Sequence, residues 1–169
     1  PLDLSEVRWD YEEPFIYDGM NHGVGLKGLP EGVTAEYEDN THSAAGEYTA
    51  TTKLVFDEEN FEKPRDIGHC VWKIKSVVID PADLEWSGYE DHVYDGSAKS
   101  VYVTNLPEDA ECEYEGAEEV PAGKYLARLS LYGNYALSGQ AEYEWEIAKA
   151  SYDMDDVSWS EAQSFIYDG

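Results

Sequence analysis

Acidic side chains at two places in the chain could hold a divalent cation. Asp80 and Asp83 lie in one short segment, and Asp153, Asp155 and Asp156 lie in another. Hard cations such as Ca²⁺ prefer carboxylate oxygens, so these five residues are the candidate calcium ligands. Neither segment has the regular spacing of aspartates found in calcium-binding loops. The competing interpretation is that these carboxylates are simply solvated.

Charge restricts the partners that the chain could bind. Its 169 residues include 11 basic and 37 acidic side chains, which gives a net charge of −26. Such a surface repels nucleic acid and anionic lipid, so we expect neither as a partner. Hydrophobic residues make up 42% of the chain and aromatic residues 14%, which indicates a folded protein. No stretch approaches the roughly 20 apolar residues of a membrane helix, and no signal peptide is present.

The elements that would position these side chains are set by an internal repeat. The triplet Tyr17-Asp18-Gly19 returns as Tyr94-Asp95-Gly96 and as Tyr167-Asp168-Gly169, at spacings of 77 and then 73 residues. A tryptophan precedes each triplet at a constant distance. The repeat is marked by residues that we expect to be structural, namely Trp9, Tyr17, Asp18, Gly19, Tyr48, Trp72, Trp86, Tyr94, Asp95, Gly96, Tyr125 and Trp145.

These spacings define the domain organisation. We expect a first repeat domain over residues 1–78, a second over 79–152, and the opening segment of a third over 153–169. The repeats differ in length by four residues, between the segment Asp57 to Gly68 and its counterpart Gly133 to Gln140. Length variation is tolerated in loops, so this segment is predicted to be a surface connection. Because the chain begins and ends within the pattern, we expect it to be a piece of a longer protein.

The repeat also argues against catalysis by histidine or cysteine. None of the four histidines recurs in the other copy. In order, His22, His42, His69 and His92 align with Lys99, Glu119, Glu142 and Phe15. No nucleophile with a matched base and no phosphate-binding glycine loop is recognisable, so we do not expect an enzyme. Cys70 and Cys112 fall at non-equivalent inward strand positions, which predicts two buried free thiols.

Alternation of apolar and polar residues predicts an all-β fold. After Gly46, the side chains of Tyr48, Ala50 and Leu54 share one face, and Tyr125, Ala127 and Leu129 repeat the pattern in the second copy. Similar short runs give six or seven strands per copy. Because no convincing amphipathic helix is present, we predict two small immunoglobulin-like β-sandwich domains in tandem, with a β-grasp-like sheet as the alternative.

Turns and corners support this interpretation. In each Asp-Gly pair the glycine accepts positive φ, and the aspartate carboxylate can accept a hydrogen bond from the N–H two residues further on. Tyr48 and Tyr125 follow a glycine at the start of a long strand. This position is typical of a tyrosine corner, in which the hydroxyl bonds to nearby backbone, and an ordinary core tyrosine is the alternative.

The order of these motifs resembles a known family. Tyr17-Asp18-Gly19, the run from Leu29 to Glu38, the Ala45-to-Thr51 segment and the Trp72-x-Ile74 motif are similar to YDG and MBG-type repeats. Such repeats occur in tandem in large bacterial cell-surface and adhesin-like proteins. The resemblance implies an extracellular, wall-attached parent protein of bacterial origin and implies no catalytic residues. The second copy departs from it at Asp109-Ala110-Glu111-Cys112.

Three functions fit these expectations. The first is a non-catalytic stalk or spacer, in which short linkers at residues 80–83 and 153–156 keep neighbouring repeats of the same chain in contact. The second is an adhesin module for a host glycan or protein, with stacking candidates Tyr11, Tyr89, Tyr102 and Tyr132. The third is a repeat that calcium makes rigid. We further expect residues 157–168 to be ordered by packing on a neighbour.

Overall fold

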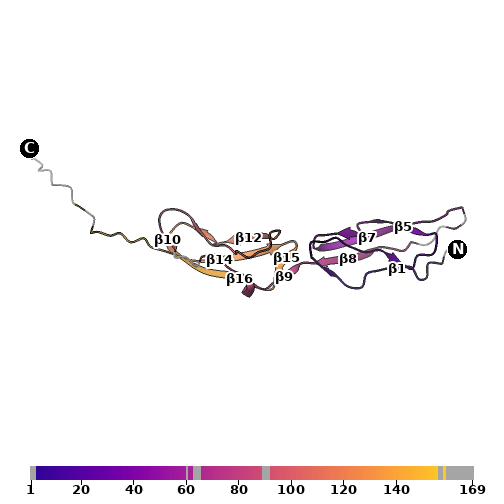
Figure 1. Ribbon diagram of the computed structural model, residues 1–169, viewed down its shortest axis with the longest axis horizontal. Helices are drawn as coiled ribbons and strands as arrows, with labels where there is room; N and C mark the ends of the chain where they lie inside the picture. Colours follow the sequence, from indigo (N-terminus) through magenta and orange to yellow (C-terminus); the bar gives the residue numbers. More distant parts are fainter. Residues whose placement is uncertain (1–2, 60, 63–65, 89–91, 156–157, 159–169) are drawn as a thin grey trace, which may run out of the picture.

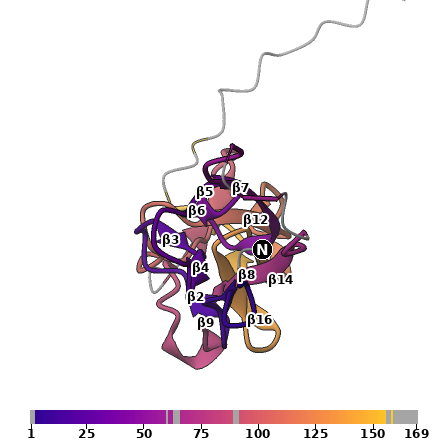
Figure 2. The ribbon, with the colours of Figure 1, turned by 90° about the vertical axis from the view of Figure 1, so that its right-hand side faces the viewer.

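Two β-domains lie end to end along the long axis of the molecule (Figure 1). The structure is a computed structural model that describes residues 3–59, 61–62, 66–88, 92–155 and 158. Viewed along that axis, the first repeat lies in front of the second (Figure 2). The expected order of residues 157–168 falls outside the described residues, apart from the exposed Ser158. The predicted all-β class is confirmed.

The first repeat is built on a four-stranded sheet with the order β2-β8-β7-β5. Its strands are β2 (Phe15–Ile16), β8 (Cys70–Lys75), β7 (Gly46–Val55) and β5 (Thr34–Glu38). Two short antiparallel pairs join β1 (Arg8–Trp9) to β4 (Leu26–Lys27) and β3 (His22–Gly23) to β6 (Thr41–His42). Strand β2 runs parallel to β8, so the beginning and the end of the repeat lie side by side.

The second repeat reproduces this plan in the order β10-β16-β14-β12. These strands are β10 (His92–Val93), β16 (Ala141–Ala148), β14 (Gly123–Tyr132) and β12 (Glu111–Glu115). Strand β11 (Lys99–Ser100) pairs with β13 (Glu118–Glu119), and a single bridge between Trp86 and Val103 takes the place of the β1-β4 pair. The only helical element among the described residues is a 3₁₀ helix, η1 (Pro81–Asp83). A β-sandwich arrangement therefore fits better than the β-grasp alternative, which requires a helix packed on the sheet.

A buried tryptophan occupies the centre of each core. Trp72 is fully buried and Trp145 is 6% exposed. The Trp72 indole N–H donates to the carbonyl of Asp39 (3.1 Å), and the Trp145 indole donates to the carbonyl of Gly116 (3.0 Å). Asp39 and Gly116 both have positive φ, 54° and 65°, and they occupy equivalent places in the two repeats. Each core thus satisfies the indole N–H of this tryptophan with a carbonyl from the same left-handed turn.

The predicted alternation of buried and exposed positions is confirmed along both long strands. Cys70 is buried and Cys112 is exposed, and both thiols are free. The prediction of burial was therefore wrong for Cys112. Cys112 lies on the edge strand β12, whose side chains become half-buried only at Tyr114, whereas its counterpart Ala35 on the edge strand β5 is half-buried.

The tyrosine-corner interpretation is confirmed in both repeats. The hydroxyl of Tyr48 donates to the carbonyl of Ala44 (2.8 Å), and that of Tyr125 donates to the carbonyl of Pro121 (2.7 Å). Each ring packs beside the central tryptophan, with centroids 5.1 Å and 5.2 Å apart. The corner therefore ties the start of the long strand to the core.

Removing the corner hydroxyl should weaken the second repeat. We expect Tyr125→Phe to lower the free energy of unfolding by about 1 kcal/mol, because one intramolecular hydrogen bond is lost while the ring stays in place. Urea denaturation followed by tryptophan fluorescence measures this. Tyr102→Phe is the matched control, since that side chain is 54% exposed. Equal effects of the two substitutions would contradict a structural role for the corner.

Candidate functional site: the junction between the repeats

The two repeats share a small sheet. Strand β9 (Val77–Ile79), at the end of the first repeat, pairs in parallel with β15 (Tyr135–Leu137) of the second. Val77 lies opposite Tyr135, and Ile79 lies opposite Leu137. The predicted domain boundary between residues 78 and 79 therefore falls within β9.

The segment expected to be a plain surface connection has a different role in each copy. Between residues 57 and 68 of the first repeat, the described residues form no strand. Its counterpart, from Gly133 to Gln140, contains β15 and carries the contact with the first repeat. The surface connection was predicted for Asp57 to Gly68, and its counterpart in the second copy is instead part of the junction. A length difference indicates where a chain can vary but does not show whether the variant binds a neighbour.

The turn between β14 and β15 forms hydrogen bonds with residues of the first repeat. The Ser76 hydroxyl donates to the carbonyl of Gly133 (2.7 Å). The Val77 N–H donates to the carbonyl of Asn134 (2.9 Å), and the Ala45 N–H donates to the Asn134 side-chain oxygen (2.8 Å). An intramolecular hydrogen bond contributes roughly 1 kcal/mol, so several together select one orientation of the repeats.

A carboxylate between two tyrosines closes the junction. Asp109 accepts hydrogen bonds from the hydroxyls of Tyr17 and Tyr135, the latter at 2.8 Å. The two rings meet edge to face with centroids 5.7 Å apart. The bonds from Tyr17 and then Tyr135 lower the pKa of Asp109, and the bond to Asp109 raises the pKa of Tyr135 to about 12. Tyr17 is the first residue of the Tyr-Asp-Gly motif, so this motif takes part in the junction.

The aspartate of the motif shapes its own turn, as predicted. Asp18 accepts a hydrogen bond from the Met20 N–H and Asp95 from the Ser97 N–H, each at 2.9 Å. Gly19 and Gly96 have positive φ, 79° and 84°.

A cationic or polar partner lies against each of these carboxylates. His22 Nε2 is 2.9 Å from Asp18, and Lys99 Nζ is 2.7 Å from Asp95. The hydrogen bonds from Lys99 and Ser97 hold the pKa of Asp95 far below its usual range. The non-recurring His22 and its counterpart Lys99 therefore fill the same structural place.

The calcium candidates do not form one cluster. Asp80 caps η1 by accepting a hydrogen bond from the Ala82 N–H (2.9 Å), and Asp153 accepts one from the Asp155 N–H (2.9 Å). Asp156 lies outside the described residues. Within the part of the chain that the structure describes, no group of three or more histidine, cysteine, aspartate or glutamate side chains is arranged to hold a metal. The predicted linker at residues 80–83 is η1 together with its capping residue Asp80.

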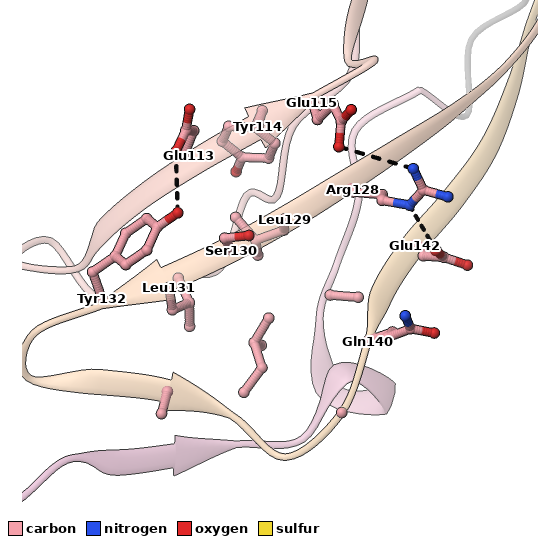
Figure 3. Close-up of a pocket in the computed structure, with 14 residues that line it drawn as sticks. Glu113, Tyr114, Glu115, Arg128, Leu129, Ser130, Leu131, Tyr132, Gln140 and Glu142 are labelled. Atoms are coloured by element: carbon pink, nitrogen blue, oxygen red, sulfur yellow. Dashed lines mark hydrogen bonds and ion pairs between the residues drawn. The ribbon is translucent and has the colours of Figure 1, made fainter.

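A hollow of about 850 Å³ lies on the second repeat beside β15 (Figure 3). Its charged side chains are paired with one another. Arg128 contacts Glu142 at 2.8 Å and Glu115 at 3.9 Å, and the Tyr132 hydroxyl donates to Glu113 at 3.0 Å. These groups are already engaged in bonds across the sheet, so they brace neighbouring strands.

The four tyrosines expected to stack on a glycan differ in their environments. Tyr11 is half-buried and accepts a hydrogen bond from the Lys73 N–H (3.1 Å). Tyr102 is exposed, Tyr132 is the partner of Glu113, and Tyr89 lies outside the described residues.

Sequence reasoning missed the residues that build the junction, namely Asp109, Asn134 and Tyr135. Asp109 was visible as a departure from the first copy, which has Gly32 in its place. Asn134 and Tyr135 lie in the segment of unequal length. All three residues lie at positions where the two copies differ, so the motifs that the copies share do not identify them.

Comparison of the chain with models of protein families, with curated proteins and with solved structures finds no match. Among the described residues, no helix has the length and apolar character needed to cross a membrane.

The Asp109 contacts should make the stability of the junction dependent on pH. A carboxyl whose pKa is lowered on folding adds stability above its unfolded pKa, near 3.8, and that stability is lost as the pH falls through the lower folded value. We expect Asp109→Ala to lower the urea midpoint at pH 7, and the difference from the parent chain to shrink below pH 4. Glu108→Ala removes a neighbouring exposed carboxylate and is the control. A difference that stays constant with pH would contradict this assignment.

Proposed function

We propose that this chain is a non-catalytic spacer segment of a bacterial cell-surface protein, in which docked repeats form a stiff rod. The observation that carries the proposal is the junction, where paired strands and the Asp109 contacts join the two domains. A flexible string of domains would need no such contacts, because domains joined by a plain linker move independently.

The long axis of the molecule supports the same function. The two repeats are arranged in a line, so each added repeat of the same kind would extend the rod (Figure 1). Their shared features lie in the core and the corners, such as Trp72 with Trp145 and Tyr48 with Tyr125. A spacer needs each repeat to fold and to dock, and it makes no demand for a common ligand-binding surface.

Placement at a bacterial cell surface rests on the resemblance to YDG and MBG-type repeats. The charge of −26 is compatible with a solvated extracellular rod, since it favours solubility and disfavours association with anionic surfaces. In this role the principal partners are neighbouring repeats, and a distal domain of the parent protein would bind any host glycan or protein.

Rigidity of the junction is testable by distance measurement between two spin labels. One label is placed on the native Cys112 and the other on Val71→Cys, an exposed position of β8, with the buried Cys70 replaced by Ala. We expect a narrow distance distribution in the parent chain. It should broaden in Tyr17→Phe combined with Ser76→Ala, which removes two side-chain bonds across the junction.

A second label pair within the second repeat, on Cys112 and Glu144→Cys, is the control and should not change. A broad distribution across the junction of the parent chain would overturn the rod function.

A further inference from the structure

We propose that the far end of the second repeat is a docking surface for a following repeat of one specific type. That type carries an aspartate directly after Leu-Pro-Glu and a tyrosine-bearing hairpin like that of residues 133–137. The inference rests on the proposed spacer function and adds to it a rule for which repeats can follow one another.

The backbone at the two ends is the same. At the end of the first repeat, the Tyr17 N–H donates to the carbonyl of Lys75 (2.9 Å). At the end of the second repeat, the Tyr94 N–H donates to the carbonyl of Ala148, also at 2.9 Å. Asp80 and Asp153 then accept equivalent hydrogen bonds from the N–H two residues further on. The donor tyrosine is therefore presented by the same framework at both ends.

Side chains at the far end of the second repeat are exposed to solvent, whereas the equivalent side chains of the first repeat are half-buried at the junction. Tyr17 is half-buried against the second repeat, whereas Tyr94 is 43% exposed. Ile79 is half-buried in the junction sheet, whereas its counterpart Tyr152 is 89% exposed. Within the described part of the chain, the Tyr94 hydroxyl has no hydrogen-bond partner. Residues 150–152 belong to no strand.

The first repeat could not occupy this surface in the same way. It has Gly32 where the second repeat has Asp109, so it has no carboxylate to accept the tyrosine hydroxyl at that place. Its segment between residues 57 and 68 contains no strand among the described residues to pair with residues 150–152. The chemistry of the surface thus selects a repeat of the second type.

The full 169-residue chain can be extended to test this. A copy of residues 97–152 is added after Gly169, which is equivalent to Gly96, so that the third repeat is completed with the sequence of the second. Spin labels are placed on the native Cys112 and on its copy, with Cys70 replaced by Ala. We expect a narrow distance distribution and slow exchange of the amides of residues 150–152.

Two variants remove single elements of the new junction. Asp109→Gly in the appended copy installs the residue that the first repeat has, and leaves the original Asp109 in place. Tyr94→Phe removes the donor. We expect each to widen the distribution at least about twofold, since domains without a fixed interface move relative to one another.

Four outcomes overturn the inference. They are a broad distribution in the extended chain, amides of residues 150–152 that exchange as fast as in the 169-residue chain, no response to either variant, or association between chains that accounts for the distances. The label pair on Val71→Cys and Cys112, which spans the first junction, distinguishes failure of the docking rule from failure of the spacer function. A narrow first junction with a broad second one overturns the docking rule alone, and two broad junctions overturn both.

Discussion

Each repeat is organised by one hydrogen bond, from a buried indole to a carbonyl in a left-handed turn. An unsatisfied N–H at the centre of so small a core would cost about 1–3 kcal/mol, a large part of the stability of a domain this size. The turn that supplies the carbonyl needs positive φ, which glycine adopts freely and aspartate tolerates better than most residues. Gly116 and Asp39 meet this need, and Tyr125 and Tyr48 then pack over the same indoles.

The repeats share this interior and differ at the ends where they meet. Asp109 replaces Gly32, and the strand β15 takes the place of a segment whose described residues form no strand. The bonds from Tyr17 and Tyr135 to Asp109 are exposed to water, so they contribute orientation more than stability. The backbone pairing of β9 with β15 supplies the continuous contact. Folding and docking are therefore carried by separate sets of residues, which can vary independently.

The sequence was sufficient to predict features that depend on local pattern. Alternation along the strand after Gly46 predicts its buried face, and the glycine before Tyr48 predicts a corner. Features that depend on a neighbour could not be predicted. Cys112 has the spacing of an inward residue and is nevertheless exposed, although its counterpart Ala35 is half-buried on the equivalent edge strand, so spacing alone does not predict its burial. Tyr135 lies in a segment that sequence comparison can assign only as variable.

The distribution of acidic residues disfavours pairing of the sheet edges with other chains, while repeats could still be added along the long axis. Strands β5 and β12 are edges of their sheets, and unpaired edges are sites where other chains can add. Exposed glutamates line both, with Glu36 and Glu38 on β5 and Glu111, Glu113 and Glu115 on β12. A second strand arriving at either edge would bring like charges together, which disfavours pairing. The far end of the second repeat instead presents the exposed Tyr94 and, among the described residues, unpaired backbone at residues 150–152, so the charge pattern of the chain favours a one-dimensional array.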